Sequence, residues 1–212
     1  MTRPREGTIM VVGREALLAE RPFQGFSPAS AFDYESLILR NYRYEPRGAA
    51  EEDPSLKQPI AYCVIVNPRL GLILAYRRAD AEGDYAEKRL RGKWSMGVGG
   101  HIDPVDLAGA NPIRASVLRE IGEEIRCAAD GDPRILGYIN DDSDMVGRVH
   151  FGVLYRLDTR ATTVEPATRE IAEARMIPAS RWRAMLDGRG AAVEAWSRIA
   201  FGPLLEVIRL TP

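Results

Sequence analysis

Three glutamates lie within one short stretch of this 212-residue chain, Glu120, Glu123 and Glu124, directly after Arg119. On a helix that advances 100° per residue, all three fall within an arc of about 100°. Like charges gathered in this way repel one another unless a cation or a proton offsets them. Carboxylate oxygens are hard ligands that suit Mg²⁺ or Mn²⁺. The spacing therefore predicts a divalent metal site.

The residues around the glutamates predict the helix that must position them. Asn111 is a good N-cap, and Pro112 suits the first helical position, where a missing N–H is harmless. We expect the helix to run from there to about Cys127. Glu124 falls at the edge of the expected apolar stripe and should be partly desolvated. Four residues form that stripe: Val117, Leu118, Ile121 and Ile125.

Arg119 precedes Glu123 by about one helical turn, so its guanidinium can hold that carboxylate. Glu120 and Glu124 are then the more direct metal ligands. The alternative is an exposed helix whose acidic side chains are merely solvated, because Arg-Glu and Glu-Glu pairs are common on helix surfaces. The N-cap and the Gly-Gly-His-Ile turn at 99–102 favour the metal site.

The stretch resembles the Nudix (MutT-like) hydrolase box, G-x5-E-x7-R-E-U-x-E-E-x-G-U, where U is a bulky aliphatic residue. Three departures stand out: Asp106 replaces a Glu, Arg126 replaces the last Gly, and residues 107–118 number 12 where the family has 7, an excess of 12 − 7 = 5. The excess precedes the expected N-cap, so it lengthens a loop and leaves the helix in register. The matching positions are Gly100, Asp106, Arg119, Glu120, Ile121, Glu123 and Glu124.

The resemblance implies a function and a role for each matching residue. The reaction would be Mg²⁺-dependent cleavage of a diphosphate linkage in a nucleoside diphosphate derivative, a small-molecule substrate. The carbonyl of Gly100 and the side chains of Glu120 and Glu124 would hold Mg²⁺ or Mn²⁺. Glu123 would be a further ligand or the base, and Arg119 would orient the site. Glu170 or Glu173 would add one further carboxylate, from outside the box, to the metal site.

The order of expected elements gives an α/β fold, a mixed β-sheet covered by helices on both faces. The resemblance implies the same fold, a Nudix-type α/β/α sandwich around a mixed β-sheet. Residues 1–57 form an N-terminal extension packed on the core, and 58–212 form the hydrolase domain with its C-terminal helices. The extension would serve in packing, dimerisation or substrate trimming, which leaves a homodimer open. Strands are expected at 9–12, 60–66, 72–76, 94–100, 133–140, 146–157 and 170–177, and helices at 34–42, 180–185 and 191–208.

Composition limits the classes of partner. The net charge is −1, from 29 basic and 30 acidic residues, so there is no global attraction to duplex nucleic acid. The apolar run at 9–12 is too short for a signal-peptide core or a membrane span. We therefore expect a cytoplasmic protein without a membrane partner. Cys63 and Cys127 have no second Cys or His at metal-binding spacing and are expected to be reduced structural thiols.

Basic residues crowd the run that leads into the glycine-rich turn, where cations can hold the phosphates of a substrate. The alternative for each is an ordinary exposed loop residue. His101 follows the turn at once, although the glutamates already supply bases, and His150 is expected to be a sheet residue. The candidate substrate-binding residues are Arg77, Arg78, Arg89, Arg91 and His101.

Two further functions remain open from the sequence. One is a Nudix-fold nucleotide-binding or regulatory protein without turnover, which the intact Arg-Glu-Ile-x-Glu-Glu run at 119–124 disfavours. The other is an enzyme like isopentenyl-diphosphate isomerase, in which a related box serves proton transfer. No cysteine or acid pair at a recognisable spacing supports that reading, although spacing alone does not exclude Cys63 or Cys127.

Overall fold

A computed structural model describes residues 7–80, 90–108, 110–188 and 190–209. Its strands are β1 (Thr8–Gly13), β2 (Gly25–Pro28), β3 (Arg43–Pro46), β4 (Leu56–Asn67), β5 (Leu72–Arg78), β6 (Trp94–Ser95), β7 (Gly97–His101), β8 (Ile125–Arg126), β9 (Arg134–Asn140), β10 (His150–Asp158), β11 (Glu165–Pro166) and β12 (Ile171–Pro178). Its helices are α1 (Arg14–Leu18), α2 (Tyr34–Asn41), α3 (Arg47–Ala50), α4 (Pro112–Glu124), α5 (Met145–Val149), α6 (Ala179–Asp187) and α7 (Ala195–Arg209), with a 3-10 turn η2 (Pro104–Ala108).

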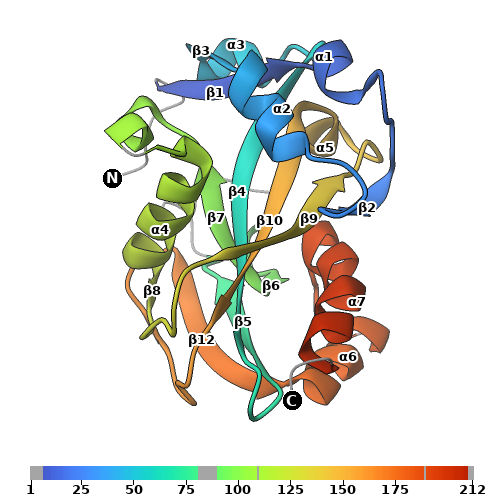
Figure 1. Ribbon diagram of the computed structural model, residues 1–212. Coiled ribbons are helices and arrows are strands. Elements are labelled where there is room, and N and C mark those ends of the chain that lie inside the picture. The colour runs from blue at the N-terminus through green and yellow to red at the C-terminus, as the bar shows by residue number, and fades with distance from the viewer. Residues whose placement is uncertain (1–6, 81–89, 109, 189, 210–212) are drawn as a thin grey trace.

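The main sheet is mixed. Its strands follow the order β12-β5-β4-β10-β9-β2, with β7 and β1 paired to β4 and β6 paired to β5. β4 and β10 run parallel, from the pair Gln58 and His150 to the pair Val66 and Asp158, whereas the other pairings are antiparallel. β4 lies at the centre of the molecule in Figure 1.

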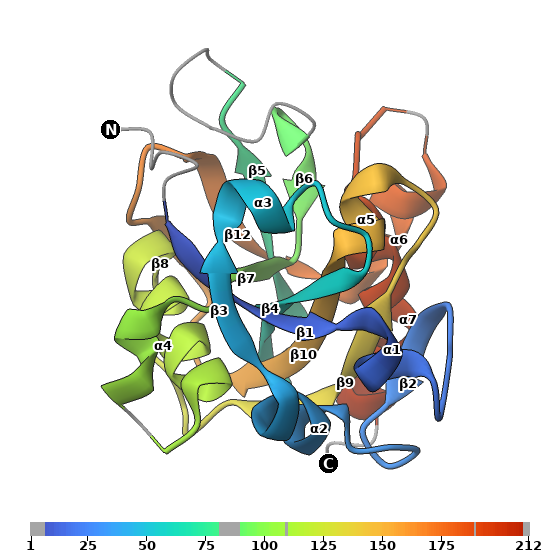
Figure 2. The same ribbon diagram turned by 90° about the horizontal axis from the view of Figure 1, so that it is seen from above.

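β4 is the central strand of the fold, and all twelve of its residues are buried. Strand residues alternate between faces, so the two sides of β4 contribute to two separate cores. Ala61, Cys63 and Ile65 belong to the core under α4, and Tyr62 and Val64 belong to the core under α6 and α7. Figures 1 and 2 show α4 on one side of the sheet and α6 and α7 on the other. The predicted α/β/α sandwich is confirmed.

The segment before residue 57 shares the sheet with the rest of the chain. β1 pairs with β3 and, through Val12 and Gly13, with the start of β4, while β2 pairs with β9. The predicted helix at 34–42 is confirmed as α2, which buries Tyr34 and Ile38. β4 itself begins at Leu56, so the boundary predicted between 57 and 58 cuts through the central strand.

The helix that carries the glutamates differs from its prediction at one end and along one face. It begins as predicted, with Asn111 accepting hydrogen bonds from the backbone of Ile113 and Arg114. It ends at Glu124 instead of about Cys127, because the next two residues are extended and pair with β11 as β8. The prediction that Leu118 joins the apolar stripe is wrong, since Leu118 is 49% exposed.

Three other predicted elements also change. Residues 146–149 are helical rather than extended, because the Asp144 carboxylate caps α5 through the backbone N–H of Gly147. The strand predicted at 94–100 is two strands, β6 and β7. The predicted helix at 191–208 begins only at Ala195, and Pro203 lies inside it without ending it.

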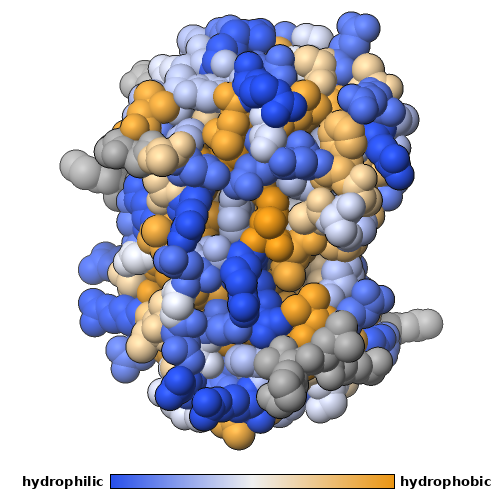
Figure 3. All heavy atoms as spheres, viewed as in Figure 1, coloured by the Kyte–Doolittle hydropathy of each residue, from blue (hydrophilic) through white to orange (hydrophobic). Residues whose placement is uncertain are grey.

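The surface seen from the direction of Figure 1 mixes hydrophilic and apolar residues (Figure 3). Within the described residues, no helix combines the length and the apolar character that crossing a membrane requires.

Candidate active site

An ion pair between α4 and η2 fixes the start of the site. Arg119 donates from Nε to Oδ1 of Asp106 at 2.9 Å and from Nη2 to Oδ2 at 3.0 Å. The same guanidinium donates to Oε1 of Glu120 at 2.6 Å and to the carbonyl of His101 at 3.1 Å. The Asp106 side chain is only 2% exposed, so this two-point contact operates away from water and is correspondingly strong. Arg119 therefore ties α4 to η2 and to the end of β7.

The predicted contact between Arg119 and Glu123 is present, but it is the longest of the set, with 3.6 Å between Nη1 and Oε2. The Glu123 side chain is 44% exposed. Arg119 thus holds Asp106 and Glu120 more closely than it holds the middle carboxylate. Glu123 projects toward solvent.

The Glu120 carboxylate lies against the backbone of Gly100. Gly100 is in β7, where it pairs with Ala61 of β4. A Cβ at this position would be 2.6 Å from Oε1 of Glu120, closer than real Cβ contacts come. Only glycine leaves room for the helix carboxylate beside the strand. The two predicted ligand positions are therefore in direct contact.

Glu124 has a buried oxygen, Oε2, without a hydrogen-bond partner in the described part of the chain. Burial raises the pKa of Glu124 to about 8; the Arg78 guanidinium opposes this rise, and the charges of Glu120, Glu170 and Glu194 add to it. Buried carboxylates are ordinarily paired or bound to a cation. The helix thus holds the buried carboxylate of Glu120 and, one turn away, the partly buried carboxylate of Glu124, which has an unsatisfied oxygen.

These donors fit a divalent cation. Within the described ranges, no three His, Cys, Asp or Glu side chains are already gathered closely enough to enclose a metal ion. The oxygens of Glu120, Glu124 and the Gly100 carbonyl would supply part of a shell, and Mg²⁺ usually completes its shell with water and substrate phosphate. The orphaned oxygen of Glu124 is the observation that agrees with such an ion.

Two of the predicted substrate-binding arginines, Arg77 and Arg78, are already engaged by acidic residues. Arg77 forms ion pairs with Glu173 at 3.2 Å and with Asp80 at 3.3 Å. Arg78 lies over the Tyr76 ring, 5.3 Å from its centroid, and donates from Nη2 to Oε2 of Glu194 at 3.4 Å. Arg91 is half-buried, and Arg89 lies outside the described residues.

The two candidates for an additional carboxylate differ in their surroundings. Glu173 binds both Arg77 and Arg175, and although partial burial raises its pKa, these two partners bring it below the ordinary value. Glu170, by contrast, adds its charge to the surroundings of Glu124. Of the two, Glu170 is the one whose charge contributes to the raised pKa of Glu124.

The side chain of His101 belongs to a polar network with Gln58 and His150. Its Nε2 lies 2.8 Å from Oε1 of Gln58 and 3.2 Å from Nε2 of His150, whose Nδ1 donates to the carbonyl of Val146 at 2.7 Å. Burial, His150 and Arg47 lower the pKa of His101 well below its ordinary value, so the ring is neutral near pH 7.

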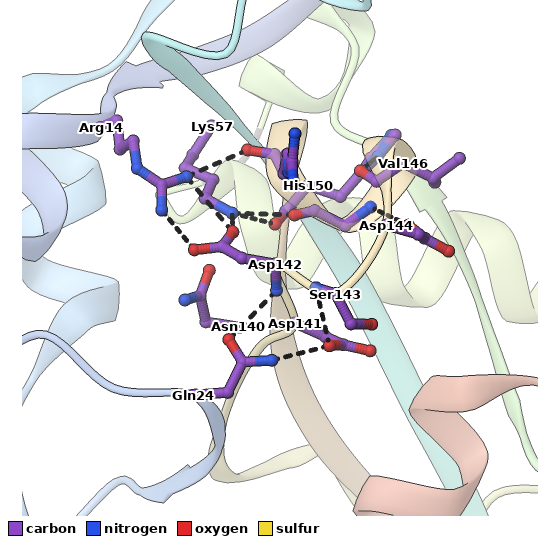
Figure 4. A network of polar contacts seen from close by, with 12 residues as sticks. Arg14, Gln24, Lys57, Asn140, Asp141, Asp142, Ser143, Asp144, Val146 and His150 are labelled. Atoms are coloured by element: carbon purple, nitrogen blue, oxygen red, sulfur yellow. Dashed lines mark hydrogen bonds and ion pairs between the residues drawn. The ribbon is translucent and has the colours of Figure 1, made fainter.

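The network continues from His150 to Lys57 (Figure 4). The fully buried Lys57 ammonium donates to the His150 carbonyl at 3.1 Å and to Asp142 at 2.7 Å, and Asp142 also binds Arg14. Both histidines thus join β4, β7 and β10, which agrees with the structural role predicted for His150.

Two residues near the glutamates are absent from the sequence prediction. Ser116 lies one turn before Arg119 and accepts a hydrogen bond from it at 3.2 Å. Because residues three apart are neighbours on a helix, the spacing alone could have indicated this contact. Glu194 precedes α7 and is only 5% exposed. An acidic residue at the start of an apolar helix reads as an ordinary surface position, so the local sequence carries no signal for Glu194.

Comparison with known proteins agrees with this geometry. A family model described as NUDIX domain matches residues 56–195. Protein YmaB of Bacillus subtilis is 40% identical over 123 residues, which are 56% of this chain and 57% of YmaB. The matched region thus spans little more than half of that relative.

Solved structures show the same fold. Tm1382, a proposed Nudix hydrolase, superimposes with a TM-score of 0.70 at 26% identity, covering 94% of this chain and 99% of Tm1382. The NUDIX domain of Shewanella oneidensis NrtR, solved with ADP ribose, superimposes with a TM-score of 0.54 at 15% identity, covering 73% of this chain and 89% of that domain. The NUDIX family model matches most of the chain, and the matched residues include Gly100, Arg119 and the three glutamates of α4. The chain therefore belongs to the Nudix hydrolase family.

Proposed function

We propose that the protein is a Mg²⁺-dependent or Mn²⁺-dependent phosphohydrolase that cleaves a diphosphate linkage in a nucleoside diphosphate derivative. The observation that carries the proposal is the buried, unsatisfied oxygen of Glu124 one turn from the buried carboxylate of Glu120. Membership in the Nudix hydrolase family supports the same reaction class.

Each residue of the site has a distinct part in this proposal. Glu120 and Glu124, with the Gly100 carbonyl, would hold the metal. When bound, the metal supplies an activated water and neutralises charge on the phosphoryl oxygens. Arg119 keeps Glu120 in place through its contacts with Asp106 and with Glu120 itself. Glu123, nearly half-exposed, can bind a further ion or accept a proton from the attacking water.

Two observations weigh against the other functions. The three glutamates and Arg119 are all present, whereas a protein that only binds nucleotides needs none of them as a set. An isomerase that protonates a carbon through a cysteine needs an accessible thiol. Cys63 is fully buried and burial raises the pKa of its thiol, which leaves only the partly buried Cys127 for such a role. Hydrolysis therefore remains the best-supported reaction.

The substrate screen should begin with nucleotide sugars and ADP-ribose, since the NrtR domain binds ADP ribose on the same fold. Dinucleoside polyphosphates, coenzyme A and nucleoside triphosphates complete it. Phosphate would be measured after a phosphatase step, with and without Mg²⁺. For a substrate with a group on each side of the diphosphate, the expected products are two phosphate monoesters.

The decisive variant is Glu124→Gln, which removes the charge and keeps the shape. We expect turnover to fall by about 100-fold or more and Mn²⁺ binding to weaken while the fold is retained. Glu20→Gln, at an exposed position, is the matched control. Wild-type turnover by folded Glu124→Gln would exclude the proposed metal site, and no turnover of any substrate by a wild-type protein that binds Mn²⁺ would favour a binding module.

A further inference from the structure

The chain changes its strand partner between β6 and β7. Ser95 in β6 pairs with Tyr76 of β5, whereas Gly97, the first residue of β7, pairs with Val64 of β4. Residues 95–97 therefore form a crossing from one strand to another, and all three are buried. Because the ladder is interrupted there, the backbone groups of the crossing need partners other than a neighbouring strand.

Side-chain hydroxyls accept from two amides of the crossing. The backbone N–H of Met96 donates to Oγ of Ser197 at 3.0 Å, and that of Gly97 donates to Oγ of Ser95 at 3.2 Å. The Gly97 carbonyl accepts from the Tyr76 hydroxyl at 2.8 Å. Since Ser197 lies in the first turn of α7, the start of this helix holds the crossing.

Glu194 is a buried carboxylate that orients both serine hydroxyls. It lies directly before α7 and is 5% exposed. Its Oε1 accepts from Ser95 at 2.5 Å, from Tyr62 at 2.7 Å and from Ser197 at 3.0 Å, while its Oε2 accepts from Arg78 at 3.4 Å. A hydroxyl has one proton to donate, and an ionised carboxylate only accepts. When each serine donates its proton to Glu194, its lone pairs remain for the amide of the crossing.

The crossing determines where β7 begins, and β7 leads to the proposed metal site. Gly100 follows Gly97 by three residues and lies against the Glu120 carboxylate. The crossing is also tightly packed, because a Cβ at Gly97 would be 2.1 Å from the Tyr62 ring. Close-packed interiors transmit a displacement instead of absorbing it. A crossing that shifts should therefore displace the Gly100 carbonyl.

We propose that Glu194 is a positioning residue for the hydrolase reaction: by orienting the two serines on the crossing, it holds the Gly100 carbonyl in the position that metal binding requires. The inference rests on the proposed metal site of α4 and β7. Glutamine at position 194 would disturb the crossing in either orientation of its amide. In one, a neutral oxygen is a weaker acceptor for the three hydroxyls. In the other, the NH₂ group donates to the hydroxyls and competes with the amides of the crossing for their lone pairs.

A purely structural role for Glu194 predicts something different. The Glu194 backbone carbonyl accepts from Arg198 and its side chain from Ser197, so the residue also helps to begin α7. If that were its whole role, loss of its charge would lower the stability of the protein and leave its metal affinity unchanged. Asp142→Asn, which weakens the pairs with Arg14 and Lys57, is the comparison for destabilisation alone.

The test is the affinity of the full-length protein for Mn²⁺, measured by titration calorimetry without substrate at a temperature where each variant is folded. We expect Glu194→Gln and Ser197→Ala each to weaken Mn²⁺ binding by about 10-fold, as when residues that orient metal ligands are changed. Because both act through the crossing, the double variant should stay within about twofold of the weaker single variant. Asp142→Asn and Glu206→Gln, an exposed position in α7, should bind Mn²⁺ like wild type.

Three results would overturn the inference. The first is unchanged affinity in either single variant, and the second is an equal loss in Asp142→Asn, which would trace the effect to stability alone. The third is losses that multiply in the double variant, because the carboxylate and the hydroxyl would then act separately. Ser197→Ala keeps the test valid if Glu194→Gln does not fold.

Glu120→Gln separates this inference from the proposed function. If that variant retains wild-type Mn²⁺ affinity and turnover, the proposed metal site itself is wrong. If it loses both while Glu194→Gln and Ser197→Ala bind Mn²⁺ like wild type, only the role of Glu194 is rejected.

Discussion

Arg119 and Asp106 form a two-point ion pair across a loop that is longer than the family's. The Nε and Nη2 atoms of Arg119 reach Oδ1 and Oδ2 of Asp106 at 2.9 and 3.0 Å. Asp106 stands where the Nudix box has Glu, and the excess residues lie between it and α4. Because the pair still closes, the longer loop leaves the relation between η2 and α4 intact.

Asp106→Asn should therefore destabilise the protein by about 3 kcal/mol, because the NH₂ end of the new amide cannot accept a hydrogen bond and the neutral side chain leaves the guanidinium poorly paired. Urea unfolding monitored by circular dichroism measures this. Asp132→Asn is the matched control, since Asp132 pairs with Arg114 at 2.7 Å but is 77% exposed, and it should change stability by less than about 0.5 kcal/mol. Equal effects of the two substitutions would show that burial does not strengthen the Arg119 pair.

Gly100→Ala should impair the active site more than the fold. The added Cβ would be 2.6 Å from Oε1 of Glu120 and would displace this carboxylate from its place beside β7. We expect Mn²⁺ affinity to fall about 10-fold or more, with a matching loss of turnover. Gly122→Ala in α4 is the control: its Cβ meets nothing within 4 Å, so it should keep activity and raise stability by about 0.5–1 kcal/mol. Normal metal binding by Gly100→Ala would show that the position of the Glu120 carboxylate does not depend on the space left by Gly100.

Local signals in the sequence predicted some features of α4 and missed others. Asn111 and Pro112 marked the start of the helix because capping depends only on neighbouring residues. The end of the helix depends on β11, some forty residues later, which pairs with Ile125 and Arg126 and draws them out of the helix. Leu118 was assigned to the wrong face because periodicity does not show how far the covered surface extends.

The glutamates of the box were recognisable from their spacing, but their electrostatic surroundings were not. The charge of Arg78, at the end of β5, opposes the raised pKa of Glu124, and Glu194 lies against Tyr62 and Ser95, which come from two other strands. Residues brought together by strand pairing carry no common pattern along the chain. For the same reason, the engagement of Arg77 by Glu173 could not be read from the basic run.

The N-terminal segment should be coupled energetically to α4 through Glu35 and Asn111. The Asn111 amide donates to Oε1 of Glu35 at 3.0 Å while its Oδ1 caps α4. Asn111→Asp keeps a good cap but places the new carboxylate next to that of Glu35, so repulsion between them should destabilise the protein by about 1 kcal/mol.

Adding Glu35→Gln to Asn111→Asp should restore stability to within about 0.5 kcal/mol of the Glu35→Gln single variant, because the glutamine amide can donate to the new aspartate. Thermal unfolding of the four proteins gives this coupling. Additive effects of the two substitutions would mean that α2 and the start of α4 are energetically independent.

Asp142 should make the protein sensitive to acid. Partial burial raises its pKa, but hydrogen bonds and charges from Arg14 and Lys57 outweigh this and lower the value from 3.8 to about 2. A carboxyl group whose pKa is lower in the folded state contributes stability above its unfolded pKa and loses that contribution as the pH falls through its folded pKa. The contribution is thus complete above about pH 4 and is lost toward pH 2. The shift of nearly two units corresponds to about 2 kcal/mol.

The difference in unfolding free energy between wild type and Asp142→Asn should therefore be largest near pH 7, where the buried Lys57 of the variant also lacks its counter-ion. It should shrink by about 2 kcal/mol between pH 4 and pH 2. Denaturant titrations of both proteins across this range give the difference directly, and the other carboxyl groups, common to both proteins, cancel. A difference that stays constant with pH would show that Asp142 stabilises the junction of β4, β9 and β10 by its shape and not by its charge.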